Sequence, residues 1–187
     1  NSFSTGPFFL VILQVETDSQ ILKGSEFENN KEFIYKVIKN FYDAKLKNIK
    51  LVFKHHPRDR GYNNYSKFIF NVSREFNIAD RVTYIHDFPL AKIFRNNFCK
   101  GTVLINSTVG YQSLFHSVPI KALGKAPYNF EGLADQRNLV SFFKKPKKVN
   151  ELLFNKFYKF ILENSQINGN FDGYFPFDRV FVFLNKQ

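Results

Sequence analysis

The stretch Pro7-Phe-Phe-Leu-Val-Ile-Leu-Gln-Val15 decides the fold class of this chain. It contains an apolar run from Phe8 to Leu13, and a short continuous run of this kind is typical of a buried β-strand. The run is far shorter than the ~20 residues that a membrane-spanning helix needs. We therefore expect it to form the first strand of a sheet in the core of the molecule.

The rest of the chain alternates similar strands with helices. Further strands are expected at Ile49–Phe53, Arg81–Ile85, Gly101–Ile105 and Pro119–Leu123. Apolar residues at helical spacing predict helices at Asn30–Lys45, Tyr62–Phe76, Leu90–Phe98, Ser107–His116, Leu139–Phe143 and Val149–Leu162. Strand and helix thus alternate about five times with short connections, which predicts parallel strands joined by right-handed crossovers. We expect one α/β domain over residues 1–187, a doubly wound parallel sheet with an irregular tail from about 167 to 187.

The composition restricts the partners and the compartment. Lys and Arg total 27 against 16 Asp and Glu, so the formal net charge is +11. This excess indicates an anionic partner, which could be nucleic acid, a nucleotide or an anionic membrane surface. Hydrophobic residues make up 44%, which excludes a disordered chain. Cys99 is the single cysteine, so an intrachain disulfide is excluded and a reduced core residue is expected.

The ends of the sequence suggest where the protein acts. The apolar run near the start lacks the basic region and cleavage site of a signal peptide, so a cytoplasmic location is expected. The basic excess would also support attachment to the anionic inner membrane. The chain begins with Asn1 and contains no Met, which favours a processed product or a fragment of a longer chain.

Polar residues follow three of the expected strands. They are Gln14 to Gln20 after the first strand, Lys54 to Arg60 after the second and Asn106 to Gly110 after the fourth. In open α/β sheets, ligands bind at the carboxyl ends of the strands. The convergence of all three segments at one edge of the sheet is the strongest physical indication of a ligand site.

Asn106, Ser107 and Thr108 lie at a strand-to-helix junction. Hydroxyl groups beside the free N–H groups at the start of a helix suit a single phosphate. The alternative is an ordinary helix N-cap, which these residue types commonly supply. Taken alone, the segment favours the cap.

The segment Lys54-His55-His56-Pro57 carries the second group of candidates. Pro57 biases His56 toward an extended backbone, from which the imidazole can donate to a phosphate oxygen or act as an acid on a leaving group. The alternatives are a solvated basic loop and a metal site. A zinc site is disfavoured because adjacent side chains of an extended backbone point in different directions and no further ligand stands at a suitable spacing.

The first strand is followed by Gln14-Val-Glu-Thr-Asp18. A carboxylate just beyond a sheet edge can serve as a nucleophile or base, although Asp18 can equally cap a turn. The sequence has no Gly-x-Gly-x-x-Gly, no Gly-Lys-Ser/Thr and no Asp-x-Asp, which argues against dinucleotides, P-loop triphosphates and a metal-clamped diphosphate. A nucleoside monophosphate donor needs fewer cations, so histidine and hydroxyl donors could hold it.

Six motifs taken together carry a resemblance to a known family. They are Gln14-Val-Glu-Thr-Asp-Ser-Gln-Ile21, Lys54-His-His-Pro-Arg-Asp-Arg-Gly61, Tyr84-Ile-His-Asp87, Ile105-Asn-Ser-Thr-Val-Gly110, Leu123-Gly-Lys-Ala-Pro-Tyr128 and Gln166-Ile-Asn-Gly169. In this order they resemble the capsular polysaccharide synthesis family, the bacterial β-Kdo transferases that build the lipid-linked Kdo linker of capsules. The match runs from Phe8 to about Phe171.

The resemblance implies a fold and an activity. Members use CMP-Kdo and have a two-domain GT-B architecture that binds the donor mainly in the Rossmann-like C-terminal half. This chain is similar to that half, so the N-terminal GT-B domain is expected to be absent from it. The implied activity is a retaining transfer of Kdo to a phosphatidylglycerol-type lipid or a growing Kdo chain. The implied location is the cytoplasmic side of the inner membrane, with no cofactor and no metal.

The resemblance also assigns roles to residues. Asp18 corresponds to a nucleophile, and His56 contacts the CMP phosphate and is the second catalytic candidate. Substrate binding is implied for Gln14, Lys54, His55, Asn106, Ser107 and Thr108. The alternative function is a non-catalytic basic α/β domain that binds nucleic acid or anionic lipid. That alternative rests on charge alone, since the aromatic residues fall mostly on apolar faces that indicate core positions, and no nucleic-acid partner is expected.

Overall fold

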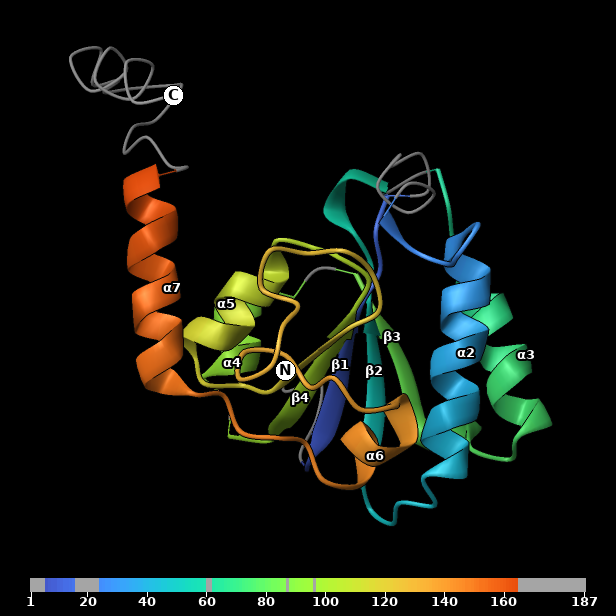
Figure 1. Cartoon of the computed structure of the whole chain (residues 1–187). Coiled ribbons are helices and arrows are strands. Elements are labelled where there is room, and N and C mark those ends of the chain that lie inside the picture. Colours follow the sequence, from blue (N-terminus) through green and yellow to red (C-terminus); the bar gives the residue numbers. More distant parts are fainter. Residues whose placement is uncertain (1–5, 16–23, 60–61, 87, 96, 165–187) are drawn as a thin grey trace. The chain divides into compact units, whose positions relative to one another are not determined.

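Strand β1 (Phe8–Ile12) lies in the middle of the sheet that the computed structural model shows (Figure 1). The structure describes residues 6–15, 24–59, 62–86, 88–95 and 97–164. Within these residues five strands form one parallel sheet in the order β3-β2-β1-β4-β5. The other strands are β2 (Lys50–Lys54), β3 (Val82–Ile85), β4 (Cys99–Leu104) and β5 (Ile120–Ala122). The predicted α/β class and parallel sheet are confirmed.

Helices connect the strands as predicted, and two more helices follow β5. They are α2 (Asn30–Asp43), α3 (Ser66–Glu75), α4 (Leu90–Phe94), α5 (Val109–Phe115), α6 (Leu139–Lys144) and α7 (Glu151–Asn164), with short 3-10 helices η1 (Pro57–Asp59) and η2 (Ala79–Arg81). Figure 1 shows α4 and α5 on the side of the sheet away from α2 and α3. The sheet is therefore doubly wound, with helices on both faces.

The side chains of β1 are buried on both faces of the sheet, which explains its continuous apolar run. Phe9, Val11 and Leu13 join a core cluster with α2, α3 and α6, while Phe8, Leu10 and Ile12 are buried without belonging to that cluster. A strand at the centre of a doubly wound sheet has no solvent face, so every position favours an apolar residue. The predicted buried strand is thus a consequence of its central place.

Several predicted boundaries differ from the structure: α3 begins at Ser66 where Tyr62 was expected, and the end of α4 differs for a reason that the contacts show. We expected a helix to continue to Phe98 and the next strand to begin at Gly101, but α4 ends at Phe94 and β4 begins at Cys99. The amide of Phe8 donates to Phe98 O at 2.9 Å, and Cys99 pairs with Phe8 across an irregularity in the register. Pairing with β1 therefore draws Cys99 into the strand. The Cys99 thiol is buried there, as expected, and burial raises its pKa to about 12.

The described residues fall into two units, Asn1–Val149 and Asn150–Gln187, and the sheet belongs to the first. In the second unit, the Asn150 side chain accepts a hydrogen bond from the amide of Leu153 at 3.0 Å and so caps α7. The expected irregular tail from about 167 lies outside the described residues. No helix among the residues that are described combines the length and the apolar character needed to span a bilayer.

Candidate functional site

The strand order reverses between β1 and β4, and this switch point is where a doubly wound sheet opens a crevice for ligands. Gln14 follows β1 and Asn106 follows β4. The side-chain amide of Gln14 donates from Nε2 to Asn106 Oδ1 at 2.6 Å, which ties the two strand ends together. Gln14 is only 5% exposed, and its Oε1 has no hydrogen-bond partner among the residues that the structure describes. A buried amide oxygen without a donor is costly, so this atom is suited to accept a hydrogen bond from a ligand.

Asn30 fixes the backbone at this point. Its Nδ2 donates to Gln14 O at 2.8 Å and to the Tyr65 hydroxyl at 3.1 Å, while its Oδ1 accepts from the Gln14 amide at 3.3 Å. Asn30 is fully buried at the start of α2, and Asn29 caps that helix by accepting from the Glu32 amide. The paired amide bonds hold Gln14 in register beyond the end of the strand. The sequence analysis did not identify Asn30 as a site residue. Its one distinguishing feature in the sequence is that it directly follows Asn29, the N-cap of α2.

A cavity of about 320 Å³ lies at the switch point. Its lining consists of Gln14, Val15, His56, Asn106, Ser107, Thr108, Lys125 and Pro127. The fold therefore brings together Gln14, His56, Asn106, Ser107 and Thr108, as the convergence of strand ends predicts. Lys125 and Pro127 come from the loop after β5 and were not among the predicted site residues. We call this hollow the switch-point cavity.

The imidazole of His56 is oriented by its own loop. Its Nδ1 accepts a hydrogen bond from the Arg58 amide at 3.1 Å, within the turn that leads into η1. Because Nδ1 is an acceptor, the ring proton of the neutral imidazole is on Nε2. His56 therefore offers an N–H donor for an anionic ligand in the switch-point cavity.

Ser107 and Thr108, the two hydroxyl residues at the start of α5, differ in their hydrogen bonds. Ser107 Oγ accepts from the Val109 amide at 3.3 Å, so Ser107 caps the first amide of α5 from the position before the N-cap. Thr108 stands at the N-cap position without a side-chain cap bond and is exposed. The hydroxyl of Tyr128 donates to Ser107 O, and the buried Tyr128 ring lies against Gly110. The turn that presents both hydroxyls is thus held from behind by Tyr128, which the sequence analysis quoted within a motif without assigning it a role.

Lys54 and His55 face a different hollow. This neighbouring cavity of about 430 Å³ is lined by Ile12, Leu13, Lys54, His55, His56, Pro57, Arg58, Phe88, Pro89, Leu90 and Val109. Lys54 is buried, and its Nζ donates to His86 O at 3.1 Å. His55 Nδ1 lies 2.6 Å from the Tyr84 hydroxyl, and burial lowers the pKa of His55. Both histidines line this neighbouring cavity, and among the described residues only His56 also lines the switch-point cavity.

Asp18, the predicted nucleophile, lies outside the described residues. Among the residues that the structure describes, no group of three or more His, Cys, Asp or Glu side chains is arranged to hold a metal ion. The donors on the residues that line the switch-point cavity include an imidazole N–H, two hydroxyls, side-chain amides and a lysine ammonium. This set can neutralise and hydrogen-bond one phosphate or carboxylate group.

Comparison with known proteins assigns the chain to a family. Residues 1–172 match the family described as capsule polysaccharide biosynthesis protein. The chain belongs to this family. It is 37% identical over 161 residues to the capsule polysaccharide export protein KpsS of Escherichia coli, covering 86% of this chain and 41% of KpsS. It is also 37% identical over 183 residues to the capsule polysaccharide modification protein LipB of Neisseria meningitidis serogroup B, covering 97% of this chain and 42% of LipB.

A solved structure supports the same fold. The KpsC β-Kdo 2,7 transferase of Thermosulfurimonas dismutans aligns with a TM-score of 0.50 and 17% sequence identity, over 84% of this chain and 55% of that chain. At this identity the likeness concerns the fold. The chain spans about four tenths of the length of the curated relatives it matches.

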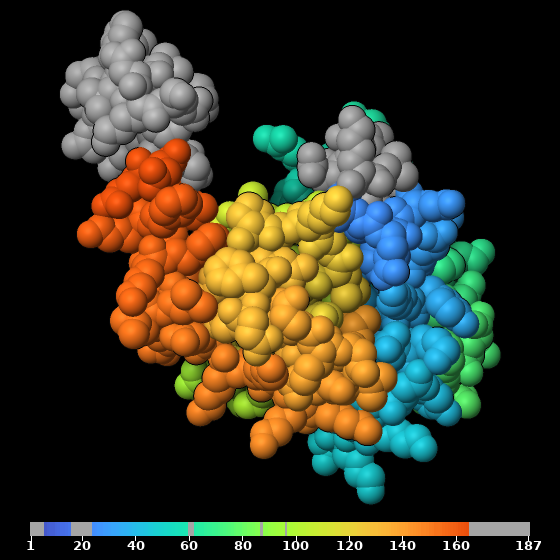
Figure 2. All heavy atoms as spheres, in the orientation of Figure 1, coloured from blue at the N-terminus to red at the C-terminus, as the bar shows by residue number. Residues whose placement is uncertain are grey.

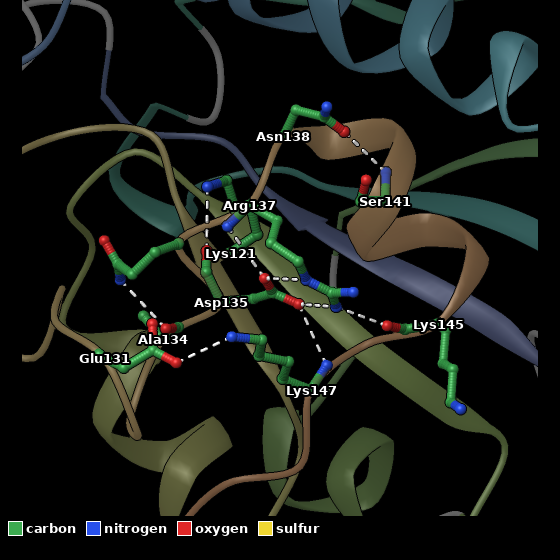
Figure 3. Close-up of polar contacts among 10 residues, drawn as sticks. Lys121, Glu131, Ala134, Asp135, Arg137, Asn138, Ser141, Lys145 and Lys147 are labelled. Atoms are coloured by element: carbon green, nitrogen blue, oxygen red, sulfur yellow. Dashed lines mark hydrogen bonds and ion pairs between the residues drawn. The ribbon is translucent and has the colours of Figure 1, made fainter.

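In this capsule-family chain, the segment after β5 is anchored by Asp135 (Figure 3). The Asp135 carboxylate is fully buried and accepts from Arg137 Nε at 2.9 Å, from Arg137 Nη2 at 2.5 Å and from the Lys147 amide at 3.1 Å. Burial alone raises the pKa of Asp135, but the hydrogen bonds from Arg137 and Lys147 outweigh it and lower the pKa to about 2. The anchored segment forms one side of the site.

Replacing Asp135 is expected to destabilise this capsule-family domain and to change its response to acid. Asp135→Asn should lower the free energy of unfolding at pH 7 by ~1–3 kcal/mol, because the carboxylate partner of Arg137 is lost. The folded pKa is about 2, below the unfolded value of ~3.9, so the stabilisation is complete above pH ~4 and disappears as the pH falls toward 2. Urea unfolding from pH 5 to pH 2 should therefore show the wild-type and variant curves converging.

The control is Glu131→Gln, which removes an exposed ion pair with Lys147 and should change stability by less than about 0.5 kcal/mol. A gap between wild type and Asp135→Asn that stays constant down to pH 2 would contradict the role given to the carboxylate.

Proposed function

We propose that this chain is the donor-binding domain of a glycosyltransferase that takes Kdo from CMP-Kdo. The acceptor is a phosphatidylglycerol-type lipid or a growing Kdo chain in capsule polysaccharide biosynthesis, and the protein works at the cytoplasmic surface of the inner membrane. The switch-point cavity carries this proposal, because it combines donors for one phosphate with an amide oxygen of Gln14 that no described residue hydrogen-bonds. The name of the structural relative, a β-Kdo 2,7 transferase, agrees with it.

The phosphate of CMP suits the donors at the switch point. His56 Nε2 and the hydroxyls of Ser107 and Thr108 line one cavity and can hydrogen-bond the oxygens of a single phosphate. A nucleoside monophosphate carries less charge than a diphosphate, so these donors can hold it without the clamp that a diphosphate requires. Protonation of the departing CMP by His56 would also make it a better leaving group.

The cytosine base fits the neighbouring cavity. That hollow shares His56 with the switch-point cavity, and the Phe88, Pro89 and Leu90 segment gives it an apolar side. A flat base can pack against this apolar side while its polar edge faces the Lys54 end of the hollow. Base and phosphate would then lie on either side of His56, which matches the connectivity of CMP.

The sugar would be transferred in two displacements. In the first, a carboxylate oxygen of Asp18 attacks C2 of Kdo, and the bond to CMP breaks with its electron pair leaving on the phosphate oxygen. In the second, an acceptor hydroxyl attacks the same carbon, loses its proton to a base, and releases Asp18 as a carboxylate. Two inversions retain the configuration of the sugar. Gln14 Oε1 can accept a hydrogen bond from a sugar hydroxyl during both steps.

Calorimetric titration with CMP tests the proposal. The wild-type protein should bind CMP, and His56→Ala should weaken binding by ~10–100-fold, because a hydrogen bond to a charged phosphate contributes ~1.5–3 kcal/mol. Ser107→Ala should weaken it to a smaller extent, since its hydroxyl also caps α5.

The matched control is Lys47→Ala, an exposed cation between α2 and β2 at the opposite edge of the sheet, which should leave CMP affinity unchanged. The same protein should be titrated with single-stranded DNA at two salt concentrations. Salt-sensitive DNA binding with no response to CMP would refute the transferase function and favour the alternative of a basic binding domain.

A further inference from the structure

A larger cavity of about 870 Å³ adjoins the switch-point cavity on the side of β5. Its lining consists of Gly24, Ser25, Glu26, Lys121, Ala122, Leu123, Gly124, Lys125, Ala126, Pro127, Asn129 and Gln136. Lys125 and Pro127 line both cavities, so the two hollows adjoin at the carboxyl edge of the sheet. Figure 2 shows the segments that form this β5 cavity meeting at the surface, the blue residues from 24 onward beside the yellow residues of the 120s.

The backbone that carries Lys125 is held tightly. The Lys125 amide donates to Gly24 O at 2.6 Å, and the Gly124 amide donates to Ile105 O at 3.0 Å. A Cβ at Gly124 would come within 2.8 Å of Gly24 O, so this close approach requires glycine. Asn129 Nδ2 closes the turn by donating to Gly124 O at 2.9 Å. The Cα of Lys125 is therefore fixed at the junction of the two cavities.

Among the charged residues that line the β5 cavity, Lys125 is the cation left for a ligand. Lys121 is buried, and its Nζ donates to Asp135 O at 2.9 Å, as Figure 3 shows. Glu26 forms an ion pair with Lys36. Lys125 is exposed, and its ammonium makes no hydrogen bond or ion pair with the described residues. A ligand anion placed where the cavities join would thus meet one uncommitted positive charge.

The rest of the lining suits a sugar. Gln136 donates from Nε2 to Asn129 Oδ1 at 3.1 Å and to Ala134 O at 3.0 Å, which fixes its amide and leaves Oε1 as an acceptor. The hydroxyl of Ser25 and the Asn129 amide line the same cavity. Fixed amides and hydroxyls are the groups that recognise sugar hydroxyls, and the volume is large enough for a monosaccharide.

We propose that the β5 cavity is the sugar-acid subsite and that Lys125 selects the donor by pairing with the carboxylate of its sugar. This inference rests on the proposed function, which places the phosphate in the adjoining switch-point cavity. A neutral hexose would leave the Lys125 ammonium without an anionic partner, whereas the carboxylate of a sugar acid would pair with it. Lys125 is then a specificity-determining residue, and it acts on the sugar more than on the nucleotide.

The test compares the affinities for CMP and for freshly generated CMP-Kdo, measured by titration with wild type, Lys125→Gln and Lys125→Arg. Wild type should bind CMP-Kdo more tightly than CMP. Lys125→Gln should reduce the ratio of the two affinities by ~5–20-fold, because a charge-assisted contact is lost, and Lys125→Arg should preserve most of it. Lys47→Gln, at the opposite edge of the sheet, is the control and should leave the ratio unchanged.

Three results would overturn the assignment of Lys125 and leave the proposed function standing. The first is an unchanged ratio in Lys125→Gln, and the second is an equal loss of affinity for CMP and CMP-Kdo, which would place Lys125 on the phosphate. The third is a higher KM for a Kdo-bearing acceptor with an unchanged ratio, which would place the acceptor's carboxylate at Lys125. A wild-type protein that binds neither CMP nor CMP-Kdo would refute the proposed function itself.

Discussion

Asp18→Ala is expected to reduce Kdo transfer by at least ~10³-fold while leaving the affinity for CMP unchanged, since removing the nucleophile of a covalent mechanism costs at least this much. In the proposed reaction Asp18 bonds to the sugar carbon and makes no contact with the nucleotide. The loss should therefore appear in kcat, with CMP titration giving the wild-type dissociation constant. Transfer is measured in the intact protein with CMP-Kdo and a lipid or Kdo-bearing acceptor.

Rescue of Asp18→Ala by azide distinguishes a nucleophilic role of Asp18 from a purely structural one. A small anion can enter the space left by the side chain in Asp18→Ala, attack the same carbon and release CMP, giving a glycosyl azide. The control is Asp43→Ala, which removes the partner of Lys39 on α2 and should keep wild-type transfer. Turnover by Asp18→Ala at the wild-type rate would remove Asp18 from the mechanism, as would CMP binding that falls together with transfer.

Gly110→Ala is expected to lower the free energy of unfolding by ~2 kcal/mol or more and to weaken CMP binding. A Cβ at Gly110 would lie 2.6 Å from the Tyr128 hydroxyl and 2.7 Å from Tyr128 Cε2. Tyr128 is fully buried and its hydroxyl donates to Ser107 O, so the ring cannot move without disturbing the Ser107 turn. A decrease in stability would be informative, because a Gly to Ala substitution within a helix normally raises the free energy of unfolding by about 1 kcal/mol.

The matched control is Gly6→Ala, where an added Cβ meets no atom within 4 Å. That variant should unfold within about 0.5 kcal/mol of wild type and should bind CMP normally. Both variants are compared by urea unfolding and by the rise in melting temperature on adding CMP. A Gly110→Ala protein as stable as wild type would show that Tyr128 can shift freely and does not support the anion site.

The sequence predicted the fold because local patterns record burial. The run from Phe8 to Leu13 is apolar throughout since β1 is covered on both faces, and each helix shows its core face in its spacing. Local patterns did not predict the boundary between α4 and β4. That boundary depends on the pairing of Cys99 with Phe8 in β1. Such a pairing joins residues that are far apart in the sequence, so it leaves no periodic pattern of apolar residues from which it could be predicted.

The candidate site was predictable only in part, for a related reason. Parallel strands place their carboxyl ends at one edge, and that rule alone brought Gln14, His56 and Asn106 to one cavity. Asn30, Tyr128 and Lys125 reach the site through contacts with residues 16, 21 and 101 positions away, namely Gln14, Ser107 and Gly24. Lys125 and Tyr128 stand in one of the motifs that carry the family resemblance, but no local pattern gave either of them or Asn30 a role. Their contacts with the site form only once the chain is folded.

The switch point also has a consequence for the lifetime of the protein. Gln14 and His56 come from the β1–β2 half of the sheet, whereas Ser107, Thr108 and Lys125 come from the β4–β5 half. A ligand in this cavity bridges the two halves, and by mass action it stabilises the folded chain by RT ln(1 + [L]/Kd). A cell that is rich in the donor would then protect the protein from opening and proteolysis. With the proposed donor as that ligand, the supply of the activated sugar and the abundance of the protein would rise and fall together.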